Sequence, residues 1–118
     1  MTALESDDSP IYLRLRGTIV AAILDGAYSE GDQLPSVRAF AAEHGANPLT
    51  VAKAYQTFQD DGYVTVRRGV GMFVAPGAVE RLRDAERAQF LERVWPRVKA
   101  QIDRVGLAAE DLLDRAHA

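Results

Sequence analysis

The sequence contains no cysteine and only two histidines, His44 and His117, so it offers few of the side chains that bind metals or act as nucleophiles. The lack of cysteine excludes disulfides, thiolate metal sites and a cysteine nucleophile. No recognisable nucleophile or metal-ligand spacing is present either, and Gly69-Val-Gly71 is too short for a phosphate-binding loop. We therefore expect no enzymatic activity and no cofactor, and we interpret His44 as a surface or partly buried residue.

Long hydrophobic runs are also missing, because no apolar stretch approaches the roughly 20 residues that span a bilayer. The first ten residues are acidic, unlike a basic and apolar signal peptide. With 118 residues, 47% hydrophobic and 26% charged, the chain has room for one core and a modest extension, but not for a large separate domain. These features predict a cytoplasmic globular protein with a flexible N-terminus over residues 1–9.

Apolar spacing predicts three helices in the first half of the chain. The first covers residues 11–24, and the second runs from a cap at Ser36 to about Gly45. Asn47 and Pro48 favour the start of a third helix, which Gly62 ends. The inward-facing residues predicted for the three helices are Ile11, Leu15, Ile19, Ala22, Ile23, Val37, Phe40, Ala41, Val51, Ala54, Tyr55 and Phe58.

Two short β-prone runs follow, Tyr63–Arg67 and Met72–Val74, and the glycine-rich segment between them favours a hairpin. Three helices and a hairpin make a mainly α fold with a small β-hairpin, the order of a winged helix-turn-helix, here over residues 10–76. The segment 77–118 is predicted to be an all-helical tail, kinked or split at Pro96. Gly106 precedes a last helix that bears Leu107, Leu112 and Leu113.

The tail carries an apolar stripe that would leave hydrophobic surface exposed on a single chain. A second copy of the chain is the natural partner for such a stripe, so we expect the tail to dimerise. Two-fold symmetry would then match two recognition helices to the halves of an inverted repeat. The predicted dimerisation residues are Leu91, Val94, Trp95, Val98 and Ile102.

The net charge of −3 argues at first against a nucleic-acid partner, because phosphate binding depends on lysine and arginine. Residues 1–78 hold nine acidic and six basic residues, whereas residues 79–118 hold eight of each. The position of the charges therefore decides the question. Four of the six bases, Arg38, Lys53, Arg67 and Arg68, fall on elements that would face one DNA duplex.

On the third helix, the side opposite the apolar face carries Leu49, Lys53 and Gln56, with Thr50 and Ala52 beside them. Base-edge chemistry would pair glutamine with adenine, lysine with guanine or phosphate, and leucine with a thymine methyl. Taken singly, each of these side chains is more simply explained as part of a solvated helix face.

Arg38 stands near a helix N-terminus that itself favours an anion, although it could also pair with Glu43. Arg67 and Arg68 flank a hairpin tip that could reach a minor groove, or could simply carry solvated charge. The predicted DNA-contact residues are Ser36, Arg38, Leu49, Thr50, Lys53, Gln56, Arg67, Arg68 and Gly69.

Several short segments of the chain together resemble the N-terminal domain of the GntR family of bacterial regulators. The resemblance runs from about Pro10 to Ala75, and the segment Gly106–Leu113 is similar to the YtrA-type subfamily, which has a short helical tail. The matching segments are Pro10-Ile-Tyr12, Gly31-Asp-Gln-Leu-Pro-Ser-Val-Arg38, Asn47-Pro48, Thr50-Val51, Ala54-Tyr55, Gly62 and Gly69-Val-Gly-Met-Phe-Val74.

The resemblance implies a transcriptional regulator that represses from a palindromic operator and dimerises through its tail. It also implies DNA contact by Arg38, Thr50, Arg68 and Gly69. Two alternatives stay open: a winged-helix module for protein–protein contact, and a regulator with a small-molecule effector bound near Tyr12 or Trp95. For both aromatic residues, core or dimer packing is the simpler explanation.

Overall fold

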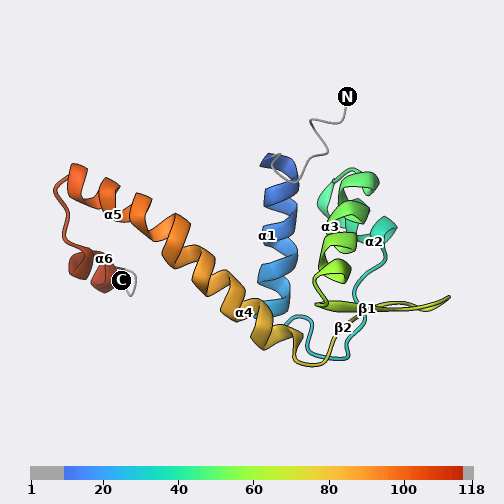
Figure 1. Cartoon of the computed structure of the whole chain (residues 1–118). Coiled ribbons are helices and arrows are strands. Elements are labelled where there is room, and N and C mark those ends of the chain that lie inside the picture. Colours follow the sequence, from blue (N-terminus) through green and yellow to red (C-terminus); the bar gives the residue numbers. More distant parts are fainter. Residues whose placement is uncertain (1–9, 116–118) are drawn as a thin grey trace. The chain divides into compact units, whose positions relative to one another are not determined.

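The computed structural model describes residues 10–115 and has the predicted order of three helices, a hairpin and further helices (Figure 1). The predicted flexible segment 1–9 lies outside the described residues. Contacts divide the chain into a winged unit that ends at Arg83 and a tail unit that begins at Asp84. None of the helices within residues 10–115 is long and apolar enough to cross a membrane. The elements are α1 (Pro10–Leu24), α2 (Val37–His44), α3 (Pro48–Asp60), β1 (Val64–Arg67), β2 (Gly71–Val74), α4 (Ala78–Gln89), the π-helix η2 (Phe90–Val94), α5 (Trp95–Arg104) and α6 (Ala109–Arg115).

The turn between α2 and α3 is as short as predicted, because both sides of it are capped. Gly45 ends α2 with a φ of 60°, a left-handed conformation that glycine adopts at little cost. The Asn47 side chain accepts a hydrogen bond of 2.8 Å from the Leu49 N–H, and Pro48 occupies the first turn of α3. The predicted caps are confirmed, and they fix where α3 begins.

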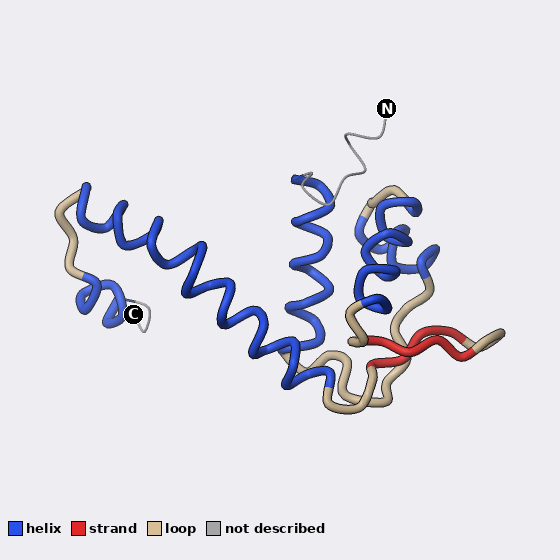
Figure 2. The backbone as a smooth tube through the Cα atoms, in the orientation of Figure 1, coloured by secondary structure: helices blue, strands red, loops and turns tan. Residues whose placement is uncertain are grey.

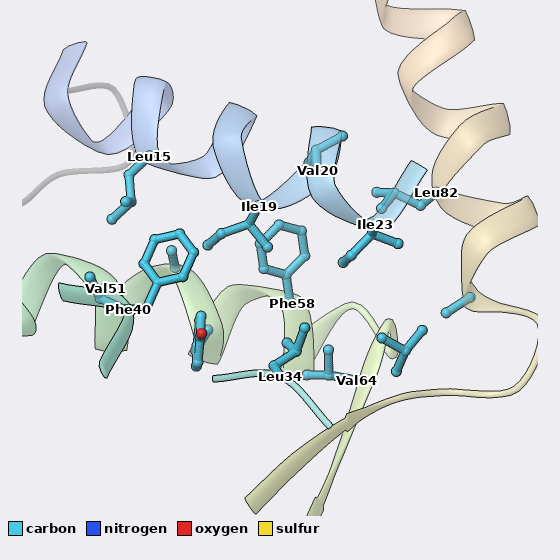
Figure 3. Packing of buried hydrophobic residues seen from close by; sticks show 14 of the residues in the cluster. Leu15, Ile19, Val20, Ile23, Leu34, Phe40, Val51, Phe58, Val64 and Leu82 are labelled. Carbon is cyan, nitrogen blue, oxygen red and sulfur yellow. The ribbon is translucent and has the colours of Figure 1, made fainter. Parts of the chain in front are cut away.

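The core of the winged unit lies where α1 packs on α3, and α2 and the hairpin close it from the sides (Figure 3). Leu15, Ile19 and Ile23 face inward as predicted. Ile11 was expected to face inward too, but it is 54% exposed, and Tyr12 at 2% takes its place. Ile11 and Tyr12 both precede Leu15 by one helical turn, and packing chooses Tyr12, whose hydroxyl donates to Thr57 on α3.

The first turns of α4 also belong to the core of the winged unit. Ala78 and Leu82 are buried, at 1% and 0% exposure, and both join the same apolar cluster as α1 and α3. Contacts therefore extend the winged unit past Pro76 to Arg83, although the hairpin that defines the wing ends at Val74. The assignment of DNA binding to residues 10–76 and of dimerisation to residues 77–118 stays a prediction.

The hairpin is a two-stranded antiparallel sheet that pairs Val64 with Val74 and Arg67 with Gly71 (Figure 2). The turn-rich segment before α2 adds to it, because the Leu34 N–H donates to the Met72 carbonyl at 2.8 Å and the Val74 N–H donates to the Asp32 carbonyl at 2.9 Å. Leu34 is 4% exposed and is a core residue that the apolar spacing did not reveal.

In the tail unit, the π-helical turn η2 separates α4 from α5 just before Pro96, which agrees with the predicted interruption of the helix there. The Trp95 N–H donates to the Phe90 carbonyl, five residues back, and this wider turn makes room for a proline ring that would clash in a regular helix. One expectation for the tail is wrong: Leu107 precedes α6 instead of lying on it, since its N–H donates to the Ile102 carbonyl in the turn around Gly106.

Candidate nucleic-acid interface

Helix α3 has one buried face and one face open to solvent. Val51, Ala54 and Phe58 are at most 1% exposed and pack inward. On the open face Leu49 is 71% exposed, Ala52 and Gln56 are exposed, and Lys53 is half-buried. The Gln56 amide donates to an Asp60 carboxylate oxygen at 2.9 Å, so the only partner described for it is another surface side chain of the same helix. A helix of this kind can present side chains to the major groove while its other face holds the fold together.

The structure corrects the expectation for Thr50. Its side chain was placed beside the open face, but the residue is 3% exposed and belongs to the buried side of α3. Thr50 lies one helical turn before Ala54, so its side chain continues the packed row that Ala54 and Phe58 form. The hydroxyl of Thr50 is therefore not part of the surface that the other α3 residues form.

Two tyrosine hydroxyls hold α3 in place. Tyr55 donates a hydrogen bond of 2.7 Å to the Pro35 carbonyl, just before α2, and burial raises the pKa of this hydroxyl well above its ordinary value. Tyr12 on α1 donates to the Thr57 hydroxyl at 3.1 Å. Tyr12 is thus a core residue that orients α3, which agrees with the packing explanation given for it.

The start of α2 offers hydrogen-bond donors and positive charge. The Ser36 hydroxyl oxygen accepts from the Ala39 N–H at 3.0 Å, which confirms the predicted cap, and both Ser36 and Arg38 are exposed. A helix N-terminus has a partial positive charge, so an arginine in its first turn adds to an existing preference for anions. This end of α2 fits a phosphate of the DNA backbone.

The wing tip is a tight turn in which the Val70 N–H donates to the Arg67 carbonyl at 2.9 Å. Arg68 and Gly69 form the exposed part of this turn. Arg67 lies on the strand, with its guanidinium 4.2 Å from the centre of the Phe73 ring. This cation–π contact holds the guanidinium over the ring, an arrangement that sequence spacing could not predict.

Two acidic residues of the winged unit, Glu30 and Asp32, bind backbone N–H groups in loops. Asp32 accepts from the Ser29 N–H at 2.8 Å, and Glu30 accepts from the Gly77 N–H at 2.9 Å. Asp32 therefore caps the backbone of the loop between α1 and α2, and Glu30 caps the backbone that follows the hairpin. Asp60 adjoins the predicted contact face, because its carboxylate accepts the hydrogen bond from Gln56. The negative net charge is thus compatible with a basic contact surface on α2, α3 and the wing.

Residues 11–74 match the family described as bacterial regulatory proteins, gntR family. The matched segment contains the whole arrangement of α1, α2, α3 and the hairpin and makes up more than half of the chain. The chain belongs to the GntR family. Members of this family are transcriptional regulators, so the chain is a regulator and not an enzyme.

Two curated relatives come from Bacillus subtilis. The chain is 34% identical over 107 residues to the uncharacterized HTH-type transcriptional regulator YhcF, covering 89% of this chain and 85% of that protein. It is 33% identical over 86 residues to the HTH-type transcriptional repressor YtrA, covering 73% of this chain and 66% of that protein. The match to YhcF reaches beyond the winged unit and includes most of the tail.

Solved structures have the same fold. A GntR family transcriptional regulator from Listeria monocytogenes is 25% identical, with a TM-score of 0.71 over 95% of this chain and 96% of that chain. The DNA-binding domain of AraR, solved in complex with operator ORX1, is 24% identical, with a TM-score of 0.52 over 56% of this chain and 80% of that chain. The predicted winged helix-turn-helix followed by a helical tail is confirmed, and the winged helix is the DNA-binding part of the regulator.

Proposed function

We propose that this GntR-family protein is a cytoplasmic repressor that binds a palindromic operator as a homodimer. Its relative YtrA is named a transcriptional repressor, and the winged fold of AraR has been solved on an operator. The observation that carries the proposal is the open face of α3 with Leu49, Lys53 and Gln56, while the opposite face of the helix is buried in the core and bonded to Pro35 through Tyr55.

In the proposed complex, α3 lies in the major groove, where Leu49 and Gln56 contact base edges and Lys53 binds a phosphate. Ser36 and Arg38 bind a phosphate at the start of α2, which fixes the position of the helix on the duplex. Arg67, Arg68 and Gly69 bring the wing to the neighbouring minor groove or its phosphates. We leave Thr50 out of this set, because its side chain is buried.

We propose that the tail forms the dimer interface. Leu91 is 57% exposed, Val94 41% and Val98 38%, so apolar side chains recur along the tail helices. Trp95 is half-buried and Ile102 is 8% exposed on the same segment. A second copy of the chain can cover this stripe and, by two-fold symmetry, place two α3 helices on the two halves of an inverted repeat.

The test is the affinity of the full chain for a duplex from its own upstream region and for a scrambled duplex, measured by fluorescence anisotropy at several salt concentrations. We expect tighter binding to the upstream duplex, which weakens steeply with salt because phosphate contacts release counterions. Reporter expression from the same region should fall when the protein is present. Equal, weak binding to both duplexes, insensitive to salt, would instead favour the winged fold as a protein–protein module.

A further inference from the structure

Gln33 joins the loop before α2 to the tip of the wing. Its side-chain amide donates a hydrogen bond of 2.9 Å to the Val70 carbonyl, across 37 residues of sequence. Gln33 also pairs with Phe73 as an isolated antiparallel bridge, so its backbone lies along β2. One residue therefore contacts the wing at two points, on the strand and beside the turn.

Gly71 makes the space for this side chain. A Cβ atom built on Gly71 would lie 2.4 Å from the Gln33 Nε2, closer than two unbonded heavy atoms can come. Gly71 also has a φ of 147°, which side-chain-bearing residues rarely adopt. The Gln33 side chain therefore reaches the Val70 carbonyl only because Gly71 has no side chain in the way.

Few other contacts hold this end of the wing. Val70 is 59% exposed, and a groove of about 250 Å³ opens next to it, lined in part by Ser36, Val37 and Met72. The backbone bonds between the loop and β2 reach only as far as Met72. Between Met72 and the wing tip, the long-range hydrogen bond described is the one that the Gln33 amide donates to the Val70 carbonyl.

We propose that Gln33 is a positioning residue that sets the direction of the wing tip, and that it acts on DNA affinity through Arg68. This proposal rests on the proposed DNA-binding function. Gln33 donates its amide to the protein itself, so we assign it no contact with DNA. Since Arg68 follows the strand at the tip, a wing whose direction varies presents this arginine to DNA for only part of the time.

The test is a double-mutant cycle on the full chain, with the upstream duplex as the probe. Gln33→Leu removes the donor and keeps a side chain of similar size. It is measured alone, with Arg68→Ala and with Arg38→Ala. Gln89→Leu, at an exposed position on α4, is the matched control for the same chemical change. Circular dichroism melting is recorded for every variant, and the assay is run below the lowest transition.

We expect Gln33→Leu to weaken binding by about threefold to tenfold and to lower the salt dependence, while Gln89→Leu binds like the wild type. In the Arg68→Ala background, Gln33→Leu should cause almost no further loss, whereas with Arg38→Ala the two losses should multiply. If Gln33→Leu does not fold at the assay temperature, Gln33→Met is used in the same cycle.

A full additional loss in the Arg68→Ala background would overturn the proposal, because Gln33 would then act independently of that arginine. Unchanged affinity in both Gln33 variants would overturn it too. These outcomes differ from failure of the proposed function, in which the wild-type protein itself shows no preference for the upstream duplex.

Discussion

The Tyr55 hydroxyl on α3 donates a hydrogen bond of 2.7 Å to the Pro35 carbonyl, which precedes the cap of α2. Tyr55 is 3% exposed, and its ring lies edge-on to Phe40 of α2, with the ring centres 6.1 Å apart. This one side chain therefore joins α3 to the loop and to the helix that precede it. The angle at which α3 presents its open face depends on the same contact.

We predict that Tyr55→Phe lowers the free energy of unfolding by about 1–2 kcal/mol, because it leaves the Pro35 carbonyl without its donor while the ring packing is kept. The measurement is urea denaturation followed by circular dichroism. Tyr28→Phe is the matched control, since within residues 10–115 no hydrogen bond of the half-buried Tyr28 hydroxyl is described. An equal loss in both variants would show that the Pro35 bond contributes nothing specific.

The same hydroxyl predicts a dependence of stability on alkaline pH. Burial, together with Tyr28 and Glu43, raises the pKa of Tyr55 in the folded state. In the unfolded chain the group ionises near pH 10, so above that pH the unfolded state binds fewer protons than the folded state. The stabilising contribution is complete below pH 10 and is lost as the pH rises above it.

Between pH 9 and pH 11, the wild type should therefore lose about 1 kcal/mol more stability than Tyr55→Phe, which has no proton to lose at this position. Urea denaturation of both proteins across this range measures the difference, and the ionisation of other residues cancels in the comparison. A difference between the two proteins that does not change with pH would contradict the assignment.

Leu82 tests the observation that α4 begins inside the winged unit. We predict that Leu82→Ala lowers the free energy of unfolding by about 2–5 kcal/mol, the range for a leucine removed from a packed core. Leu13→Ala, at a position that is 53% exposed on α1, should change it by only about 0.5 kcal/mol. Denaturation at matched protein concentration is the measurement, and equal effects of the two variants would place Leu82 outside the core.

The proposed dimer is tested in the tail. Val98→Glu places a charge on the apolar stripe, and we expect sedimentation velocity to show a change from dimer to monomer at micromolar concentration. Arg97→Glu introduces the same side chain at the neighbouring exposed position and should leave the dimer intact. A wild-type protein that sediments as a monomer would remove the tail from the dimerisation role.

Sequence reasoning predicted the elements whose ends are marked by particular side chains. Asn47, Pro48 and Gly45 define the turn between α2 and α3 by local chemistry, so no tertiary information was needed to find it. The interruption of the tail helix before Pro96 was predictable for the same reason, although its form as a π-helical turn was not. The open face of α3 followed from helical spacing together with these ends.

The wrong expectations concern residues whose burial depends on tertiary packing and not on local sequence. Helical spacing allowed Ile11 as an inward residue and Thr50 as an outward one, because the edge of an apolar face is not defined by periodicity alone. Leu34 and Gln33 lie in a turn-rich segment without any period, so their roles in the core and the wing depend on partners about 40 residues away. Contacts of this range had no signal in the sequence taken by itself.

The central claim is that α2, α3 and the wing form the DNA-contact surface. It is tested most directly by the salt dependence of binding to the upstream duplex for the wild type, Arg38→Ala and Lys53→Ala, with Arg97→Ala in the tail as the control. Each of the first two variants should bind more weakly and lower the slope of log affinity against log salt by about one, while Arg97→Ala should match the wild type. Unchanged slopes for Arg38→Ala and Lys53→Ala, with a reduced slope for Arg97→Ala, would contradict the claim and place the phosphate contacts on the tail.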